Sequence, residues 1–558
     1  MTFDRHLPYW PPGMPRSVDV PQSSVYENVA AVAAKDPEGT ALYYYGERVS
    51  FARLKSEADL LAGYLQQRCG VKKGDRVLLY LQNSPQFVIA YYAVLRADAV
   101  AVPVNPMNMT EELRHYMEDA ETAVAIVGQD RIAQLAPLVG EGGLRHVVLA
   151  TYADYLPARR EFPLPDFVGA AAERPGDARI VPWREALAAR CVPSEHRARG
   201  PDLAVMPYTS GTTGKPKGCM HTHANVQSTA VIYLLWRGSP EGGKVVTLSA
   251  LPFFHVTGMQ AGMNGPLYAG SCIVIMSRWD RECAAMLIER ARVTNWSAIT
   301  TMLVDFLANP SLGKHDLSSL KVLGGGGAAM PEAFARKLED VFHLPYVEGY
   351  GLSETMAPTH INPPQRPKRQ CGGIPICNTD ARVVDIDTFA DKAPNEVGEI
   401  IVHGPQVFQG YWKQPQATAE AFVEHDGKRF FRTGDLGYYD DEGYFFITDR
   451  LKRMINASGF KVWPAEVEAM LYAHPDIQEA CVIAALDGYR GETVKAVIVP
   501  KKEARGRLRA EEIVEWARGR MAAFKVPRRV EFVEELPKTA TGKILWRKLQ
   551  EEEYRKAP

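Results

Sequence analysis

A run of glycines, hydroxyl side chains and lysines occupies residues 208–218, with the sequence YTSGTTGKPKG. Backbone N–H groups in such a glycine-rich turn can approach the oxygens of a polyphosphate closely, and the hydroxyl and lysine side chains add further donors. The run overlaps the end of the apolar segment LAVMPY (203–208) and precedes a helix that we expect to begin near His223. The sequence therefore predicts a strand, a phosphate-binding loop and a helix in succession, with ATP as the ligand.

The loop differs from the phosphate loop of kinases and GTPases, which follows the pattern G-x-x-x-x-G-K-[ST]. Here two residues separate Gly211 from Gly214, and Pro216 follows Lys215. A flexible linker is the alternative interpretation, but linkers seldom lie between an apolar strand and a helix. We therefore expect a phosphate-binding loop of another class.

Length and composition limit the range of functions. A chain of 558 residues is too long for one ordinary hydrophobic core, so we expect at least two domains, one large and one small. With 46% hydrophobic residues, 23% charged residues and a net charge of −1, the composition is that of a globular protein. It lacks the strong positive field of a nucleic-acid-binding protein, which favours small-molecule chemistry and no nucleic-acid partner.

The cysteines and the apolar segments bear on the compartment. The eight cysteines form no CxxC pair and have no histidine at zinc spacing, which fits a reducing cytoplasm. The N-terminal segment lacks the basic and apolar regions of a signal peptide. Arg96 and Asp98 interrupt the apolar stretch FVIAYYAVLRADAVAVPV, which is then unsuited to span a bilayer. We expect a cytoplasmic protein, with at most peripheral contact at the inner face of the membrane.

Helices and strands alternate in the first part of the chain. Residues 51–69 are expected to form an amphipathic helix and residues 75–82 a buried strand. Ser84 and Pro85 supply an N-cap and a first-turn proline for the next helix, and AVAVPV (99–104) is the following strand. The segment of about residues 150–200, rich in Pro, Arg and Gly, reads as a surface excursion, after which the alternation resumes. This pattern predicts mostly parallel sheets covered by helices.

The pattern changes near residue 450. Two helices (464–474 and 510–524) and three strands (479–486, 493–500 and 529–535) are expected there, after the charged joint TDRLKRM (448–454). We therefore predict a large domain at residues 1–449 and a small α+β domain at residues 450–558.

The loop is accompanied by further motifs: LPFFHVTG (251–258), EGYGLSET (348–355), FRTGD (431–435), DRLKRMINASGFKVWPAEVE (449–468) and LPKTATGKILWRKL (536–549). With these, the chain resembles the adenylate-forming superfamily of acyl-CoA synthetases, firefly luciferase and the adenylation domains of peptide synthetases. It is most similar to bacterial long-chain fatty-acid:CoA ligases, through ASGFKVWPAEVE, GPQVFQGYW and KVPRRVEF. The resemblance implies an α/β fold, with a large N-terminal domain of parallel-rich sheets covered by helices and a small mobile α+β C-terminal domain.

The resemblance also implies a two-step reaction. A carboxylate attacks the α-phosphorus of ATP to give an acyl adenylate and pyrophosphate, and the thiol of coenzyme A then displaces AMP. Both steps build charge on oxygens, so the protein acts mainly by positioning and electrostatic stabilisation. The implied partners are a medium- or long-chain fatty acid or another small carboxylate, ATP with Mg²⁺, and coenzyme A. The sequence leaves open whether the protein forms a homodimer.

The nucleotide site is assigned by the same resemblance. Thr209 and Glu354 are expected to bind Mg²⁺, because a phosphate-bound cation takes only one or two protein oxygens. Tyr350 would stack on one side of the adenine, and Gly327 and Ala328 would line its other side. Two acceptor oxygens suit Asp435 to the ribose hydroxyls, and Arg450 would add a ribose or phosphate contact. The other residues assigned to cofactor binding are Ser210, Gly211, Thr212, Thr213, Gly214, Lys217, Gly351 and Thr355.

Lys543 in KTATGK is implied to be a mobile catalytic cation that meets the α-phosphate and the carboxylate. His255 in LPFFHVTG is implied to lie beside the acyl channel; a purely structural histidine is the alternative. Between the two steps the small domain would rotate, withdrawing Lys543 and presenting the SGF segment to coenzyme A. Lys452 matches the hinge of this rotation and Gly459 a glycine of the pantetheine tunnel. The implied catalytic set is Lys543, Thr209, Glu354 and His255.

The residues expected in the acyl pocket do not decide which of several acids is the substrate. An apolar set of side chains is expected to line it: Phe254, Val256, Met259, Thr300, Met302 and Met356. We favour a medium- or long-chain fatty acid. A CoA ligase for an aromatic or alicyclic acid and a non-CoA adenylating enzyme are the alternatives. A peptide-synthetase adenylation domain would carry an Asp after the PFFH-like motif and an attached carrier domain, and neither is evident. A non-catalytic relative would have lost Glu354 or Lys543, and both are present.

Overall fold

The computed structural model describes residues 3–141, 143–209, 216–237, 244–326, 330, 332–457, 460–487, 491–539 and 544–556. Contacts divide the chain into two compact units. The first consists mainly of His6–Asp380 and Val402–Phe431, and the second of Phe3–Arg5, Ala381–Ile401 and Arg432–Pro558. Residues 381–401 and 432–449 thus belong to the second unit by their contacts. The domain boundary that we expect at residue 450 stays a prediction.

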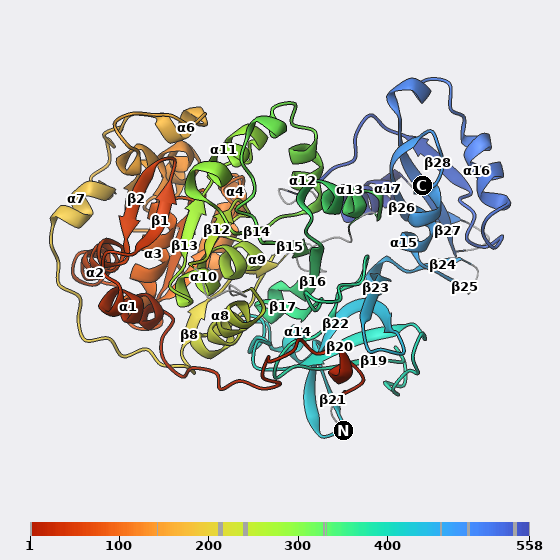
Figure 1. Ribbon diagram of the computed structural model, residues 1–558, viewed down its shortest axis with the longest axis horizontal. Coiled ribbons are helices and arrows are strands. Elements are labelled where there is room, and N and C mark those ends of the chain that lie inside the picture. The colour runs from red at the N-terminus through yellow and green to blue at the C-terminus, as the bar shows by residue number, and fades with distance from the viewer. Residues whose placement is uncertain are drawn as a thin grey trace. The chain divides into compact units, whose positions relative to one another are not determined.

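A nine-stranded sheet of order β18-β17-β16-β15-β14-β12-β13-β1-β2 lies in the first unit (Figure 1). The neighbours from β16 to β1 are parallel, whereas β2, β17 and β18 are antiparallel to theirs. Its strands are β1 (Thr40–Tyr44), β2 (Glu47–Ser50), β12 (Val246–Ser249), β13 (Cys272–Ile275), β14 (Asn295–Ser297), β15 (Val322–Gly326), β16 (Tyr346–Leu352), β17 (Ala357–Ile361) and β18 (Ile374–Pro375).

A seven-stranded sheet of order β11-β8-β4-β3-β5-β6-β7 lies in the same unit and is parallel except for β11. Its strands are β3 (Arg76–Tyr80), β4 (Val100–Pro103), β5 (Val124–Gly128), β6 (His146–Ala150), β7 (Ile180–Pro182), β8 (Leu203–Val205) and β11 (His221–Thr222). The sheets confirm the predicted α/β fold class.

The first unit also contains helices. They are α1 (Tyr26–Lys35), α2 (Phe51–Gln67), α3 (Pro85–Arg96), α4 (Thr110–Ala120), α5 (Ile132–Leu135), α6 (Asp166–Gly169), α7 (Trp183–Ala188), α8 (His223–Arg237), α9 (Val256–Met259), α10 (Gly265–Tyr268), α11 (Arg281–Ala291), α12 (Thr300–Leu307), α13 (Glu332–Phe342) and α14 (Pro415–Glu420). The predicted cap of α3 is confirmed, since the Ser84 side chain accepts a hydrogen bond from Phe87 N (3.1 Å). Residues of α3 share one hydrophobic core with Leu79 of one sheet and Leu248 of the other.

One expectation for the first unit is wrong. The segment read as a surface excursion contains β7, an edge strand of the seven-stranded sheet, and Trp183, which is buried. The indole of Trp183 donates a hydrogen bond to Tyr155 Oη (3.1 Å). Three residues of strand among prolines and arginines carry too little periodicity to be recognised from sequence.

Strand β22 (Lys428–Tyr439) begins in the first unit, where it pairs with β21 (Phe422–His425), and ends in the second, where it pairs with β23 (Phe445–Arg450). Strands β19 (Asp380–Val384) and β20 (Gly398–His403) are neighbours in a sheet.

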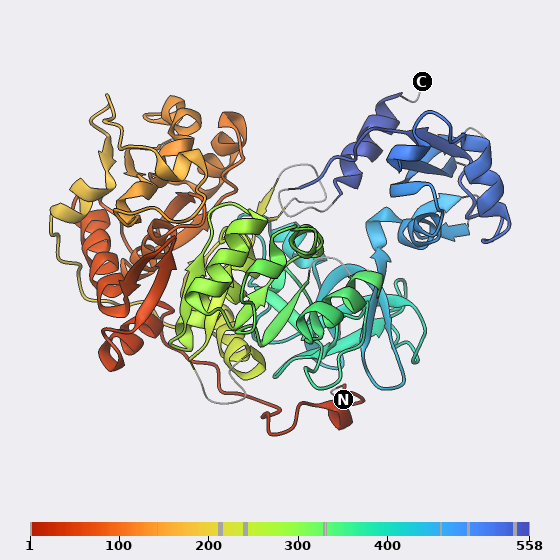
Figure 2. The same cartoon turned by 45° about the horizontal axis from the view of Figure 1, so that its top comes forward.

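The C-terminal part of the second unit, drawn in blue in Figure 2, has a sheet. The order of its strands is β25-β24-β27-β26, with β28 parallel to β27. Its elements are β24 (Ile455–Ala457), β25 (Phe460–Val462), α15 (Pro464–Tyr472), β26 (Ile477–Asp487), β27 (Gly491–Pro500), α16 (Ala510–Arg518), β28 (Arg529–Phe532) and α17 (Trp546–Lys556). Val467 of α15, Val482 of β26 and Ile513 of α16 belong to one hydrophobic core. The expected small α+β fold is confirmed.

None of the helices in the described ranges combines the length and the apolar character that crossing a membrane requires.

Candidate active site

Two short paired strands, called the hairpin below, flank the predicted phosphate loop. Strands β9 (Tyr208–Thr209) and β10 (Lys217–Gly218) are antiparallel, and Thr209 lies directly opposite Lys217. The two residues therefore stand at the base of the loop. The loop residues expected to bind the nucleotide, Ser210, Gly211, Thr212, Thr213 and Gly214, lie outside the described residues.

The expected passage from the loop directly into a helix is wrong. Helix α8 begins at His223 as predicted, but β10 and β11 lie between the loop and this helix. Two N–H groups of its first turn are already used: His223 N donates to Asp202 O and Ala224 N to Gly200 O (both 2.9 Å). These two helix N–H groups are therefore not available to an anion at the loop.

Side chains from distant segments fix the base of this hairpin. The Tyr208 hydroxyl group donates to Asp119 Oδ2 (2.6 Å), and the indole of Trp412 donates to Asp119 O (2.9 Å). The backbone continues the connection, since Trp412 N donates to Gly218 O (2.8 Å). Both strands of the hairpin are thus held at their outer ends.

Glu354 lies in the 3₁₀ turn η7 (Ser353–Thr355), which follows β16 directly. Its residue is 8% exposed, and Oε1 accepts a hydrogen bond from the Tyr411 hydroxyl group (3.0 Å). Thr355 is buried and closes the turn, since its hydroxyl group accepts from Leu352 N (2.9 Å) and contacts Ala357 O (2.8 Å). The turn therefore holds the Glu354 carboxylate in a defined place.

A buried histidine supports the same turn. His221 Nε2 lies 2.7 Å from the carbonyl oxygen of Ser353. Burial lowers the pKa of His221 to about 4, so the neutral ring donates its Nε2–H to this oxygen at neutral pH. His221 was not predicted, because the contact joins residues 132 positions apart.

The hairpin and the turn meet through Tyr411. Lys217 Nζ lies 5.3 Å from the centroid of the Tyr411 ring, whose hydroxyl group reaches Glu354. Thr209 pairs with Lys217, and the side chains of Lys217 and Glu354 both contact Tyr411. The hydroxyl oxygen of Thr209 and the carboxylate of Glu354 are donors of the kind that a hard divalent cation takes beside phosphate oxygens, so the residues fit Mg²⁺. Tyr411 was not predicted, although it lies in the quoted motif GPQVFQGYW.

The expected adenine site lies partly within the described residues. Tyr350 is half-buried on β16, with its ring 5.7 Å from that of His360. Gly351 is required sterically, because a Cβ there would lie 1.9 Å from Ala357 O. Gly327 and Ala328 lie outside the described residues.

A buried carboxyl group precedes Tyr350 on the same strand and was not predicted. Glu348 accepts hydrogen bonds from Gln370 N (3.1 Å) and from the backbone of Met330. Burial raises its pKa to about 7, against the opposing effect of these hydrogen bonds. The hydrogen bond from Met330, which follows the expected adenine loop, therefore joins this residue to strand β16 through Glu348.

The expected ribose residues are neighbours in the second unit. Asp435 of β22 faces Arg450 of β23, and Arg450 Nε lies 2.8 Å from Asp435 Oδ1. Asp435 is 2% exposed, whereas the side chain of Arg450 is half exposed. Lys452 lies in the turn η8 (Leu451–Arg453), and Gly459 and Lys543 lie outside the described residues.

The expected acyl-pocket residues share an apolar environment. His255 is half-buried at the N-cap of α9, where Nδ1 accepts a long hydrogen bond from Thr257 N (3.4 Å). Thr300 is the first residue of α12. The other five belong to one hydrophobic core: Val256, Met259 and Met356 are buried within it, and Phe254 and Met302 pack against it.

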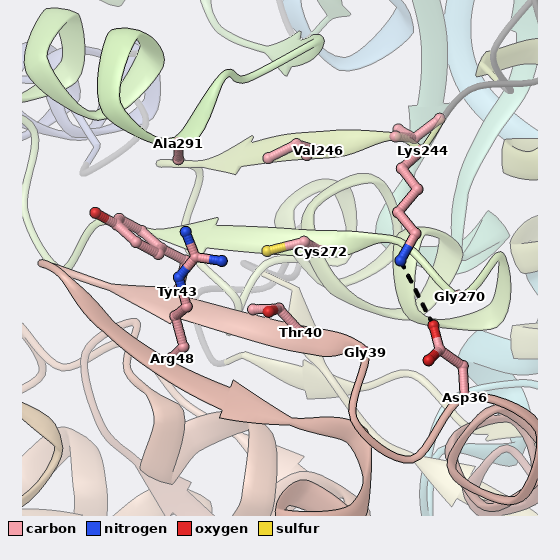
Figure 3. A pocket seen from close by; sticks show the side chains of 11 residues that line it. Asp36, Gly39, Thr40, Tyr43, Arg48, Lys244, Val246, Gly270, Cys272 and Ala291 are labelled. Carbon is pink, nitrogen blue, oxygen red and sulfur yellow. Dashed lines mark ion pairs between the residues drawn. The ribbon is translucent and has the colours of Figure 1, made fainter.

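A shallow pocket in the first unit holds none of the predicted residues. Thr40, Val246 and Cys272 line it at the beginnings of three parallel strands, together with Arg48 and Lys244 (Figure 3). Its volume of about 220 Å³ is below the usual range of ligand sites. Ligands of open α/β sheets bind where strands end, and several predicted residues, among them His255, Thr300 and Glu354, follow the ends of strands of the nine-stranded sheet. We therefore exclude this pocket as the candidate site.

Comparison with known proteins is consistent with this geometry. The family model of the AMP-binding enzyme matches residues 29–412, and that of the AMP-binding enzyme C-terminal domain matches residues 466–543. The chain is 38% identical to a long-chain-fatty-acid–CoA ligase of Bacillus subtilis (strain 168) over 558 residues, covering 98% of each. It is 33% identical to a feruloyl-CoA synthase of Amycolatopsis sp over 515 residues, covering 92% of this chain and 96% of the relative.

A solved structure extends the similarity to three dimensions. The o-succinylbenzoate CoA synthetase MenE from Bacillus subtilis, in complex with the acyl-adenylate intermediate OSB-AMP, is 26% identical, with a TM-score of 0.78. The similarity covers 95% of this chain and 98% of that structure. The matched families, the motifs and the fold agree, and the chain belongs to the AMP-binding enzyme family, as an AMP-forming acid–thiol ligase.

Proposed function

We propose that the protein activates a medium- or long-chain fatty acid and transfers the acyl group to coenzyme A. A carboxylate oxygen bonds to the α-phosphorus of ATP and pyrophosphate leaves; the thiol sulfur then bonds to the acyl carbon, losing its proton, and AMP leaves. The observation that carries the proposal is the apolar character of five of the expected acyl-pocket residues, which lie in or against one hydrophobic core. The similarity to the long-chain ligase of Bacillus subtilis supports it.

The nucleotide roles are proposals that the site geometry supports. The phosphate chain would lie along the loop between Thr209 and Lys217, with adenine on Tyr350 and the ribose at Asp435 and Arg450. Thr209 and Glu354 would hold Mg²⁺, which when bound supplies positive charge against the phosphate oxygens. The nearly buried position of Glu354 supports this role, because a carboxylate shielded from water interacts more strongly with a cation.

Glu354→Gln is expected to raise the Mg²⁺ concentration for half-maximal adenylation by about tenfold, because the shape is kept and the negative charge is lost. Carboxylate-dependent ATP–pyrophosphate exchange at graded Mg²⁺ concentrations measures this. A Glu332→Gln variant removes an exposed carboxylate of α13 and serves as the control. An unchanged Mg²⁺ titration would assign the ligand role to another residue.

The second step is proposed to use the small domain in another position. Lys543 would serve adenylation, and rotation about Lys452 would then present the segment with Gly459 to coenzyme A. His255 is proposed to lie beside the substrate carboxylate.

Gly459→Leu is expected to leave ATP–pyrophosphate exchange unchanged and to lower thioester formation by about tenfold or more, since a side chain would fill the path of the pantetheine arm. Both half-reactions are measured on the same preparation. Retention of the thioesterification rate would show that Gly459 does not line that path.

An aromatic acid is the second candidate substrate. It is favoured by the similarity to a feruloyl-CoA synthase and to a synthetase of o-succinylbenzoate.

The proposed fatty-acid:CoA ligase reaction is tested by incubating decanoate, ATP and coenzyme A with the protein and identifying the products. We expect decanoyl-CoA, AMP and pyrophosphate in equal amounts. Formation of ADP, or of decanoyl adenylate without a thioester, would contradict the proposed reaction.

A further inference from the structure

Tyr411 connects the two parts of the site described above. Its hydroxyl group donates to Glu354 Oε1 (3.0 Å), and its ring lies beneath Lys217 Nζ at 5.3 Å. The first contact joins residues 57 positions apart, and both belong to the first unit. A single side chain thus touches the carboxylate proposed to hold the cation and the lysine at the base of the phosphate loop.

The hydroxyl group of Tyr411 is the donor of this hydrogen bond, because an ionised carboxylate has only acceptor oxygens. A neutral phenol beside a carboxylate makes a charge-assisted hydrogen bond, which is stronger and more directional than a neutral one. The bond therefore restricts the rotation of the Glu354 carboxylate about its terminal torsion.

The ring of Tyr411 is itself held in place. It packs edge-on against Phe408, with centroids 4.9 Å apart, and its backbone forms an isolated bridge with Cys219. Tyr411 N donates to Thr418 Oγ1 (2.9 Å). The backbone of Phe408 also binds the Glu354 turn, because Phe408 N donates to Glu354 O (2.9 Å). The phenol oxygen is therefore fixed relative to the turn that carries the carboxylate.

We infer that Tyr411 is a positioning residue for nucleotide activation: its hydroxyl group orients the Glu354 carboxylate for the divalent cation that accompanies ATP. The inference rests on the proposed role of Glu354. Tyr411 acts through Glu354, so its contribution belongs to cation affinity and to the adenylation step. The affinities for the acyl substrate and for coenzyme A do not depend on it.

The test compares Tyr411→Phe, Glu354→Gln and the double variant by calorimetric titration of ATP binding and by ATP–pyrophosphate exchange with decanoate, both at graded Mg²⁺ concentrations. Phenylalanine keeps the ring against Phe408 and removes only the hydrogen bond. Tyr411→Phe is expected to raise the half-saturating Mg²⁺ concentration about tenfold, the usual effect of a lost hydrogen bond to a charged group. The double variant is expected to resemble Glu354→Gln alone, because the two groups act as one unit.

Tyr26→Phe is the matched control, since the Tyr26 hydroxyl group also donates to a carboxylate, Asp59 Oδ1 (2.6 Å), in the same unit. It should leave the Mg²⁺ titration unchanged, and the unfolding temperatures of all variants identify any loss of fold. If Glu354→Gln shifts the titration but Tyr411→Phe does not, or if the two effects add in the double variant, the positioning role is refuted while the metal role stands. If Glu354→Gln causes no shift, the proposed metal role itself fails, and the inference fails with it.

Discussion

Replacing Lys543 with alanine should lower the rate of acyl-adenylate formation by about 10² to 10³, while thioester formation from supplied decanoyl adenylate stays largely intact. The reason is electrostatic: negative charge builds on the α-phosphate oxygens as the carboxylate attacks, and a positioned cation stabilises it in that step alone. Single-turnover rates of the two half-reactions measure the difference.

Lys538→Ala is the control for this variant. Lys538 is the first residue of the same KTATGK motif but lies at the surface, where Nζ pairs with Glu479 at 2.5 Å. Loss of that pair should change neither half-reaction, since exposed ion pairs contribute little. Equal damage to both half-reactions in Lys543→Ala would refute a role confined to adenylation.

The catalytic efficiency kcat/KM should rise from butyrate to decanoate by about tenfold for each two-carbon extension. Each methylene transferred from water to an apolar site contributes about 0.8 kcal/mol, and the residues expected to meet the chain are Val256, Met259 and Met356, all buried in one core. Steady-state rates with butyrate, hexanoate, octanoate and decanoate measure the slope. A decline before octanoate would indicate a short pocket and would contradict a medium- or long-chain acid.

The sequence predicted the fold where periodicity and end signals coincide. Helix α3 has a serine cap, a first-turn proline and an apolar body, and all three are present in the structure. Helix α8 begins at the expected residue. The strands β10 and β11 were missed, because two residues are too few to show a periodic pattern, and so was β7, which lies among prolines and arginines.

The candidate site could be predicted only where a motif carries it. The motifs assign roles to Glu354 and Lys217. Tyr411, although it lies in a quoted motif, and His221 act through contacts across 57 and 132 positions. No local pattern encodes such contacts, since they depend on how strands and turns meet in the fold. Glu348 was missed for a related reason: a glutamate in a strand is usually solvated, and its burial is a tertiary effect.

The central claim, a fatty-acid:CoA ligase, is tested most directly by competition in one reaction. Decanoate, benzoate and cyclohexanecarboxylate are mixed at equal concentrations with ATP, Mg²⁺, coenzyme A and the protein, and the thioesters formed at low conversion are quantified by mass spectrometry. The ratio of products equals the ratio of kcat/KM values, so the result is independent of enzyme concentration. We predict that decanoyl-CoA exceeds both ring thioesters by more than about tenfold. An excess of benzoyl-CoA or cyclohexanecarbonyl-CoA would contradict the fatty-acid assignment.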